Sequence, residues 1–299
     1  MGARDPSLGR LYEGHLNAVL LVALYGTDVQ RRAAARDARA GCLFGVWNTQ
    51  ANEPVRVSQK PRRFVLSGAK TWCSGADSVT RALITAQTHD GSMQMCLVPM
   101  DRARATVDDS AWRPLGMEAS NSFRVDFSGV ELEEGDLIGS PGDYERSPWF
   151  LGGALRFAAV HAGIVERLAA ETYAFLVATG RKDDAMQLAR AGELRIATAG
   201  ARNWIDAGEA AWLAFDSDPS ERNAATVVAQ ADMARLAIER AGLDALELAV
   251  RSVGARGLLE PLPFAGLVRD LTMYLRQPAP DATLLRVGAG ALASVSGVV

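Results

Sequence analysis

Cysteine is scarce in this sequence of 299 residues, with three copies and no CxxC or His–Cys spacing among them. Neither a disulfide framework nor a zinc site is therefore indicated. The sequence also lacks a secretory leader and any run of about 18 uncharged apolar residues, so we expect no membrane partner. Lysine and arginine form no dense block and the formal charge is −3, which disfavours nucleic acid as a partner. A cytoplasmic protein is the simplest expectation.

Apolar residues, by contrast, make up 48% of the sequence, enough for a substantial core. Residues 8–25 have helical spacing, and Thr27 with Gln30 forms a capping box for a second helix through about Arg39. From 42 to 130 the sequence changes to short β-rich runs separated by turn residues, which is typical of an antiparallel sheet or small barrel.

After a Pro- and Gly-rich connector at 139–143 the sequence is helical to its end, and the helix lengths predict an antiparallel bundle. The predicted fold class is α+β, with short N-terminal helices, a middle antiparallel β-domain and a C-terminal antiparallel helical bundle. The predicted boundaries are 1–40 for a shortened N-terminal helical segment, 41–140 for the β-domain and 145–299 for the bundle.

The segment Leu66–Gly75 is the most informative motif, because it places an indole and a hydroxyl two residues apart. On a strand, residues i and i+2 point to the same side, so Trp72 and Ser74 are predicted to face one ligand together. A flat indole can stack on a conjugated ring while a hydroxyl bonds to a ring heteroatom. The alternative is an ordinary core tryptophan followed by a Ser-Gly turn.

The order helix, sheet, bundle resembles that of the acyl-CoA dehydrogenase superfamily, and four motifs carry the resemblance. They are Leu66–Gly75, 116–130 with 137–139, Val253–Gly257, and the pair Arg269–Asp270. The resemblance implies a flavoprotein that holds FAD between its domains and completes each FAD site with a neighbouring subunit. A homo-oligomer, dimer or tetramer, and a small-molecule substrate, such as an acyl-CoA, are therefore expected.

Matched residue by residue, the resemblance implies a set of FAD-binding positions. Backbone and a hydroxyl at the end of the first strand would face the flavin, an arginine would pair with the diphosphate, and two glycines would let backbone approach the cofactor. These positions are Trp47, Asn48, Thr49, Trp72, Ser74, Arg181, Gly254 and Gly257. From the residues alone, the alternatives are a solvent-facing hydroxyl for Thr49, a charge at a helix end for Arg181 and helix C-caps for the two glycines.

The glutamate base of the family has no counterpart here, because its two usual positions hold Pro278 and Leu155. Asp281 and His15 are the candidate catalytic residues in its place. The alternative for Asp281 is a helix N-cap. His161, in a helix of small residues, either lines the flavin cavity or is a buried core histidine.

Three functions follow from these matches and mismatches. The first is an FAD-dependent oxidoreductase acting on the CH–CH bond of an acyl thioester without the usual glutamate. The second is a flavin-dependent monooxygenase on the same fold, because the spacing from Arg181 to Gln187 is similar to that of a branch which includes flavin-dependent hydroxylases. The third is a non-catalytic flavin-binding or partner subunit. The segment Ala51–Pro54, in place of the family's Gly/Ser-rich loop, weakens the expectation of CoA binding.

Overall fold

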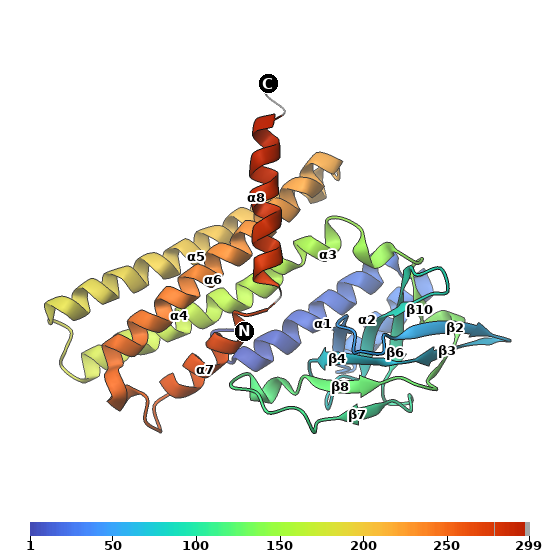
Figure 1. Ribbon diagram of the computed structural model, residues 1–299, viewed down its shortest axis with the longest axis horizontal. Coiled ribbons are helices and arrows are strands. Elements are labelled where there is room, and N and C mark those ends of the chain that lie inside the picture. Colours follow the sequence, from blue (N-terminus) through green and yellow to red (C-terminus); the bar gives the residue numbers. More distant parts are fainter. Residues whose placement is uncertain (278, 297–299) are drawn as a thin grey trace. The chain divides into compact units, whose positions relative to one another are not determined.

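A computed structural model describes residues 1–277 and 279–296 (Figure 1). Their contacts group the chain into two compact units. The sheet unit comprises residues 10–113 and 118–146, and the helical unit comprises 1–9, 114–117 and the chain from Ser147 onward. The three-segment division expected from the sequence stays a prediction.

Two helices open the chain, as predicted: α1 (Pro6–Tyr25) and α2 (Asp28–Arg39). The capping box is confirmed, since Thr27 Oγ1 accepts from Gln30 N at 3.3 Å and Gln30 Oε1 accepts from Thr27 N at 2.7 Å. These bonds satisfy two backbone donors that the first turn of α2 leaves without a helical partner.

The β-rich part forms two sheets. The strands are β1 (Phe44–Trp47), β2 (Arg56–Lys60), β3 (Arg63–Ser67), β4 (Ala69–Cys73), β5 (Arg81–Gln87), β6 (Met93–Pro99), β7 (Thr106–Asp108), β8 (Phe123–Asp126), β9 (Glu131–Leu132) and β10 (Leu137–Ile138). The larger sheet has the order β10-β6-β5-β2-β3-β9, with β1 also paired to β5, and the smaller has the order β4-β8-β7. Most pairings are antiparallel, as expected, while β1 and β2 each pair with β5 in parallel.

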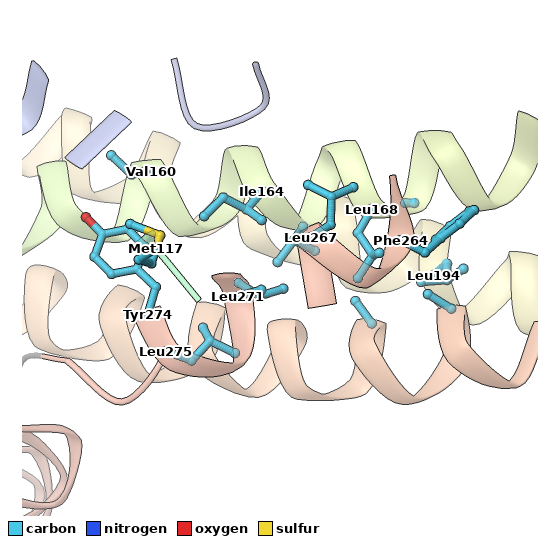
Figure 2. Close-up of a cluster of buried hydrophobic side chains, with 14 of the residues drawn as sticks. Met117, Val160, Ile164, Leu168, Leu194, Phe264, Leu267, Leu271, Tyr274 and Leu275 are labelled. Atoms are coloured by element: carbon cyan, nitrogen blue, oxygen red, sulfur yellow. The ribbon is translucent and has the colours of Figure 1, made fainter. Parts of the chain in front are cut away.

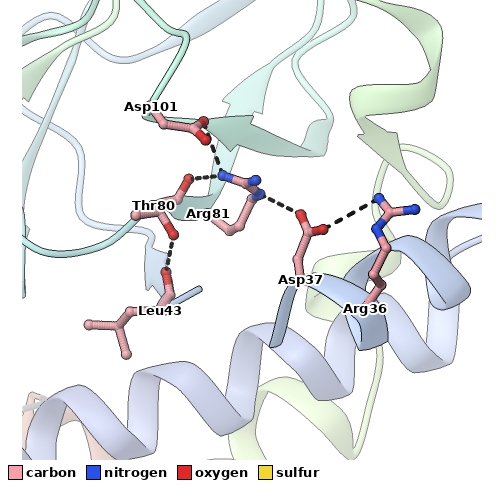
Figure 3. A network of polar contacts seen from close by, with 6 residues as sticks. All are labelled: Arg36, Asp37, Leu43, Thr80, Arg81 and Asp101. Carbon is pink, nitrogen blue, oxygen red and sulfur yellow. Dashed lines mark hydrogen bonds and ion pairs between the residues drawn. The ribbon is translucent and has the colours of Figure 1, made fainter. Parts of the chain in front are cut away.

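Arg81, at the start of β5, ties α2 to the larger sheet (Figure 3). Its Nε donates to Asp37 Oδ2 at 2.7 Å, and its Nη1 lies 3.0 Å from Asp101 Oδ1. Burial raises the pKa of Asp37, but the hydrogen bond and charge of Arg81 outweigh burial and leave that pKa below its usual value. The pair therefore stabilises the sheet unit in its ionised form.

The remainder of the chain is helical. The helices are α3 (Trp149–Gly152), α4 (Ala154–Ala178), α5 (Ala185–Ser217), α6 (Glu221–Gly257), α7 (Phe264–Tyr274) and α8 (Pro280–Ser296). The three long and two short helices predicted for this region are confirmed, and the single turn α3 is an addition. In Figure 1, α4, α5 and α6 run side by side.

Aliphatic and aromatic side chains of α4, α5, α6 and α7 form the core of the helical unit (Figure 2). Met117 enters this core from the segment 114–117, and its backbone N donates to Asp270 Oδ1 at 2.6 Å. A Cβ on Gly116 would lie 2.3 Å from the carbonyl of Arg269, so only glycine permits this close approach. Two motifs that are distant in sequence thus meet inside one unit.

No helix in the described ranges is long and apolar enough to cross a membrane. The three cysteines are free.

Candidate functional site

The turn after β4 differs from the strand geometry that the sequence suggested. Trp72 has φ of 56°, and the pairing of β4 with β8 shifts register between Lys70 and Cys73. Because β4 ends at Cys73, Ser74 lies outside the strand, and the expectation that Trp72 and Ser74 share a strand face is wrong. A bulge, in which one extra residue re-aims its side chain, replaces the regular alternation.

Trp72 is 43% exposed, so it is not an ordinary core tryptophan. Its ring meets that of Trp112 edge to face at a centroid distance of 5.9 Å. The Trp112 ring also meets the Phe123 ring edge to face, at a centroid distance of 6.4 Å. Trp112 Nε1 donates to Glu118 O at 3.0 Å, so the Trp112 ring is held from two sides. A left-handed backbone costs a bulky residue about 1–3 kcal/mol, and such strain persists where the surroundings impose it and often marks a ligand site.

A chain of three serine hydroxyls begins next to Trp72. Ser74 Oγ lies 3.0 Å from Ser122 Oγ, which lies 2.9 Å from Ser120 Oγ. Ser120 and Ser122 are buried, whereas Ser74 is only partly buried. The backbone N of Gly75 donates to Ser120 O at 2.8 Å and holds the two segments together.

Sequence reasoning missed Ser120 and Ser122. Their only signal was their place in the motif 116–130, beside Asn121, whose φ of 41° is also left-handed.

The end of β1 lies against the same turn. Trp47 is buried, and its Nε1 donates to Ser74 O at 3.0 Å, so its indole supports the turn from inside. Asn48 and Thr49 are exposed, and Thr49 O accepts from Thr71 N at 3.0 Å. Five of the predicted cofactor-binding residues, from β1 and from the turn after β4, are thus connected within the sheet unit.

Arg181 follows the end of α4 in the helical unit. Gly180 has φ of 70°, its N donates to Val177 O at 3.1 Å, and Arg181 N donates to Leu176 O at 2.8 Å. This is a Schellman motif, in which glycine takes the left-handed position that ends a helix. The guanidinium is only partly buried.

Arg181 meets the kink of α6, where Gly254 has φ of 64° and ψ of −173°. Arg181 Nη1 donates to Ser252 O at 3.0 Å, and Arg190 Nη1 donates to Arg251 O at 3.2 Å. The side-chain amide of Gln187 is oriented so that its nitrogen donates to Ser252 Oγ. Its oxygen then accepts from Arg181 Nη2 and, at 3.1 Å, from Arg190 Nη1. The structure therefore places the guanidinium groups of Arg181 and Arg190 on carbonyls of α6 that lie two and three residues before Gly254.

The two predicted glycines have different surroundings. Nothing lies within 4 Å of a Cβ built on Gly254, so its glycine is required by the backbone angle alone. A Cβ on Gly257 would lie 2.3 Å from the Cβ of Val253, within the last turn of the same helix. Local packing thus explains Gly257 without a cofactor.

The candidate bases lie in different settings. His15 Nδ1 accepts from Phe44 N at 3.1 Å, and burial lowers the pKa of His15. Asp281 is exposed in the first turn of α8, directly after Pro280, rather than at an N-cap. Leu155 is buried, and Pro278 lies outside the described residues.

His161, on α4, is fully buried between Phe157 and Tyr274, at ring distances of 4.7 and 4.4 Å. Burial, followed by the charge of Arg235, lowers the pKa of His161 well below its usual value. The burial fits the interpretation of His161 as a core histidine, but its ring nitrogens are not satisfied as that interpretation expected, because neither has a hydrogen-bond partner among the described residues.

No protein-family model matches the chain. A dibenzothiophene monooxygenase of Rhodococcus qingshengii is 29% identical over 184 residues, which are 55% of this chain and 44% of that protein. This chain therefore spans less than half the length of that relative. A putative acyl-CoA dehydrogenase of Bacillus subtilis, YdbM, is 23% identical over 291 residues, covering 93% of this chain and 73% of the relative.

Solved structures are similar over nearly the whole chain. Methanesulfinate monooxygenase MsuC of Pseudomonas fluorescens has a TM-score of 0.87 at 21% identity, covering 98% of this chain and 80% of its own. Butyryl-CoA dehydrogenase of Megasphaera elsdenii has a TM-score of 0.85 at 14% identity, covering 97% and 79%. TdsC of Paenibacillus sp. A11-2, in complex with FMN and indole, has a TM-score of 0.82 at 23% identity, covering 96% and 80%.

The fold is thus the one shared by acyl-CoA dehydrogenases and related flavin monooxygenases. The resemblance seen in the sequence is confirmed, and this chain has the acyl-CoA dehydrogenase fold.

Proposed function

We propose that this protein is a flavin-dependent monooxygenase that acts on a small aromatic or heteroatom-containing molecule. The observation that carries the proposal is the exposed indole of Trp72, held by a strained backbone beside the Ser74 hydroxyl. The similarity to dibenzothiophene monooxygenase supports the reaction class. Leu155, which cannot remove a proton, favours oxygenation over α-proton abstraction from an acyl thioester.

The residues of the sheet unit fit a flavin ring. The indole of Trp72 supplies a flat apolar surface, and the hydroxyls of Ser74 and Thr49 can each donate to or accept from ring heteroatoms. Ser122 holds the Ser74 hydroxyl at 3.0 Å, which limits the directions in which Ser74 can donate. A reduced flavin held by these residues would supply two electrons, and with two protons these would let one oxygen atom of O₂ enter the substrate while the other leaves as water.

Arg181, in the helical unit, is by itself suited to hold a phosphate group. A guanidinium has five N–H donors, and Arg181 uses only some of them on Ser252 O and Gln187. The remaining donors are suited to phosphate oxygens. The sequence predicts FAD, whereas the related TdsC binds FMN, and both carry such a phosphate.

Titration of the purified protein with FMN and with FAD, followed by flavin fluorescence, tests the cofactor. We expect at least one to bind and to raise the melting temperature, because a ligand of the native state stabilises it. Ser74→Ala and Trp72→Ala should weaken binding, whereas Ser58→Ala, at an exposed serine of β2, should not. A protein that binds neither flavin would instead support a non-catalytic subunit.

Reduced flavin, oxygen and indole or dibenzothiophene, mixed with the protein, test the reaction. We expect oxygenated product at a rate that falls at least tenfold in Ser74→Ala, if this hydroxyl orients the ring. Formation of only hydrogen peroxide, with every substrate tried, would count against oxygen transfer.

Dehydrogenation of an acyl thioester is the second candidate, favoured by the similarity to YdbM over most of the chain. It needs a base, and Asp281 and His15 remain the proposed residues. In an anaerobic mixture with butyryl-CoA, the oxidised flavin should then lose its colour, and Asp281→Asn or His15→Asn should slow that change. If both variants match the wild-type rate, neither residue is the base.

We further propose a cytoplasmic homo-oligomer, either a dimer or a tetramer. Large apolar side chains on the helical unit support it, since Ile196 on α5 is 74% exposed and Leu285 on α8 is 75% exposed. Light scattering coupled to size-exclusion chromatography should report a multiple of the 31.9 kDa chain mass. A single-chain mass at micromolar concentration would exclude a stable oligomer.

A further inference from the structure

Lys70, on β4, has an unusual setting. It is fully buried, and no carboxylate of the described residues forms an ion pair with it. Burying an ammonium group without a counter-charge is costly, and lysine is among the residues least often buried. A side chain that serves only to fill space would avoid this cost if it were methionine or leucine. The position of Lys70 therefore calls for a role that uses its nitrogen.

The nitrogen of Lys70 holds the end of β1. Nζ donates to Asn48 O and to Thr85 Oγ1, each at 2.9 Å, and Thr85 Oγ1 donates to Asn48 Oδ1 at 2.6 Å. Both oxygens of Asn48 are thus held from the interior of the sheet unit. Asn48 and Thr49 are nevertheless exposed.

This arrangement decides which atoms Asn48 can offer to a ligand. Because Oδ1 accepts from Thr85, the amide nitrogen is the free end of the side chain, and no described residue accepts from it. An amide nitrogen is a donor only. Asn48 is followed by Thr49, whose carbonyl accepts from Thr71 N at 3.0 Å, next to Trp72 in the sequence. The N–H groups of Asn48 therefore belong to the segment bonded to the turn of Trp72 and Ser74, and they are suited to acceptor atoms of a bound ring.

The Lys70 amine can keep this role in either charge state. Burial lowers the pKa of Lys70 to about 7, against smaller opposing effects of Cys73 on β4 and Cys96 on β6. Burial also raises the pKa of both thiols, that of Cys96 to about 12, so these neighbours remain neutral near pH 7. A neutral amine still has two N–H donors, enough for Asn48 O and Thr85 Oγ1.

We infer that Lys70, together with Thr85, is a positioning residue that orients Asn48 toward the flavin ring. The inference rests on the proposed flavin site and identifies residues that support it without contact with the cofactor. Loss of either residue should weaken flavin binding through Asn48, so the two effects should not be additive.

Flavin dissociation constants and urea midpoints of five variants test this inference. We expect Lys70→Met and Thr85→Val each to weaken flavin binding about tenfold, and the double variant to weaken it no further. Thr85→Ser retains the hydroxyl and should bind as the wild type does. Lys60→Met, at an exposed lysine of β2, is the control for loss of a lysine charge.

Four results would overturn this inference. If the wild-type protein binds flavin and both Lys70→Met and Thr85→Val bind it with the same affinity, the inference is overturned and the proposed function is left intact. The inference is also overturned if the flavin affinity falls in Thr85→Ser as much as in Thr85→Val. A loss of affinity in Lys70→Met and Thr85→Val that only follows their loss of stability would likewise show a purely structural role. A wild-type protein that binds neither FMN nor FAD would overturn the proposed function and this inference together.

Discussion

Two buried cations, one in each unit, are held in opposite ways. Arg235, on α6, is 1% exposed and donates to Glu239 Oε2 at 3.1 Å, to Leu275 O at 2.8 Å and to Gln277 O at 2.7 Å. Lys70 is equally buried but contacts only neutral oxygens. Arg235 thus has a counter-charge and satisfies two carbonyls where α7 ends, whereas Lys70 has no counter-charge and satisfies a single carbonyl, that of Asn48.

This difference separates two purposes of a buried charge. Arginine, with its fork of donors, is suited to hold several acceptors at the end of a helix. Lysine, a single point donor, fixes one residue at the price of desolvation. We therefore expect Arg235 to matter mainly for stability and Lys70 mainly for the site.

The largest expected effect is that of Arg235→Met. It leaves Glu239 and two carbonyls without their buried donor and should destabilise the protein by about 3–5 kcal/mol. Urea unfolding followed by circular dichroism measures this. Arg240→Met, which removes an exposed pair with Asp244 on the same helix, should cost about 0–1 kcal/mol. If Lys70→Met lowers the free energy of unfolding as much as Arg235→Met does, the two buried cations do not differ in their contribution to stability.

Arg81→Met should have an intermediate effect, about 1–3 kcal/mol, because Arg81 is mostly buried and bonded to Asp37 and Asp101. The same urea experiment applies. Arg63→Met, at a pair with Glu131 whose side chains are both 54% exposed, is the matched control in the sheet unit. Equal midpoints for the two variants would mean that burial of the ion pair does not determine its contribution.

The pH dependence of stability has a separate window for each unit. Both Lys70 and His161 have lowered pKa values in the folded protein, so the unfolded chain takes up the proton first and stability falls as pH falls. For Lys70 the loss runs from about pH 10 down to about pH 7. For His161 it begins near pH 6.5 and continues downward, by at most about 1.4 kcal/mol per pH unit.

Urea midpoints between pH 5 and pH 10 measure both windows. Lys70→Met should remove the upper slope and His161→Leu the lower one, while His89→Leu, at an exposed histidine, should change neither. If Lys70→Met leaves the stability profile above pH 7 unchanged, the amine is not desolvated as its burial indicates.

Local patterns were predictable from the sequence where neighbouring residues determine the structure. The capping box of Thr27 and Gln30 needs only contacts three residues apart, and the left-handed Gly180 ends α4 within its own last turn. The helix order of the C-terminal half followed from apolar spacing for the same reason. Trp72 stood out in the sequence as a candidate ligand-facing residue, but its bulge depends on pairing with β8, about 50 residues away.

The sequence by itself determined the class of each segment, the order of those segments and the chemistry available at Trp72, Ser74 and Arg181. Only the tertiary structure decided which partners these residues have. Ser122 reaches Ser74, Arg181 reaches Ser252, and Lys70 reaches Asn48 across gaps of 48, 71 and 22 residues. The physical reason is that a hydrogen bond acts over about 3 Å, and sequence spacing sets such distances only within one helix turn or one tight turn.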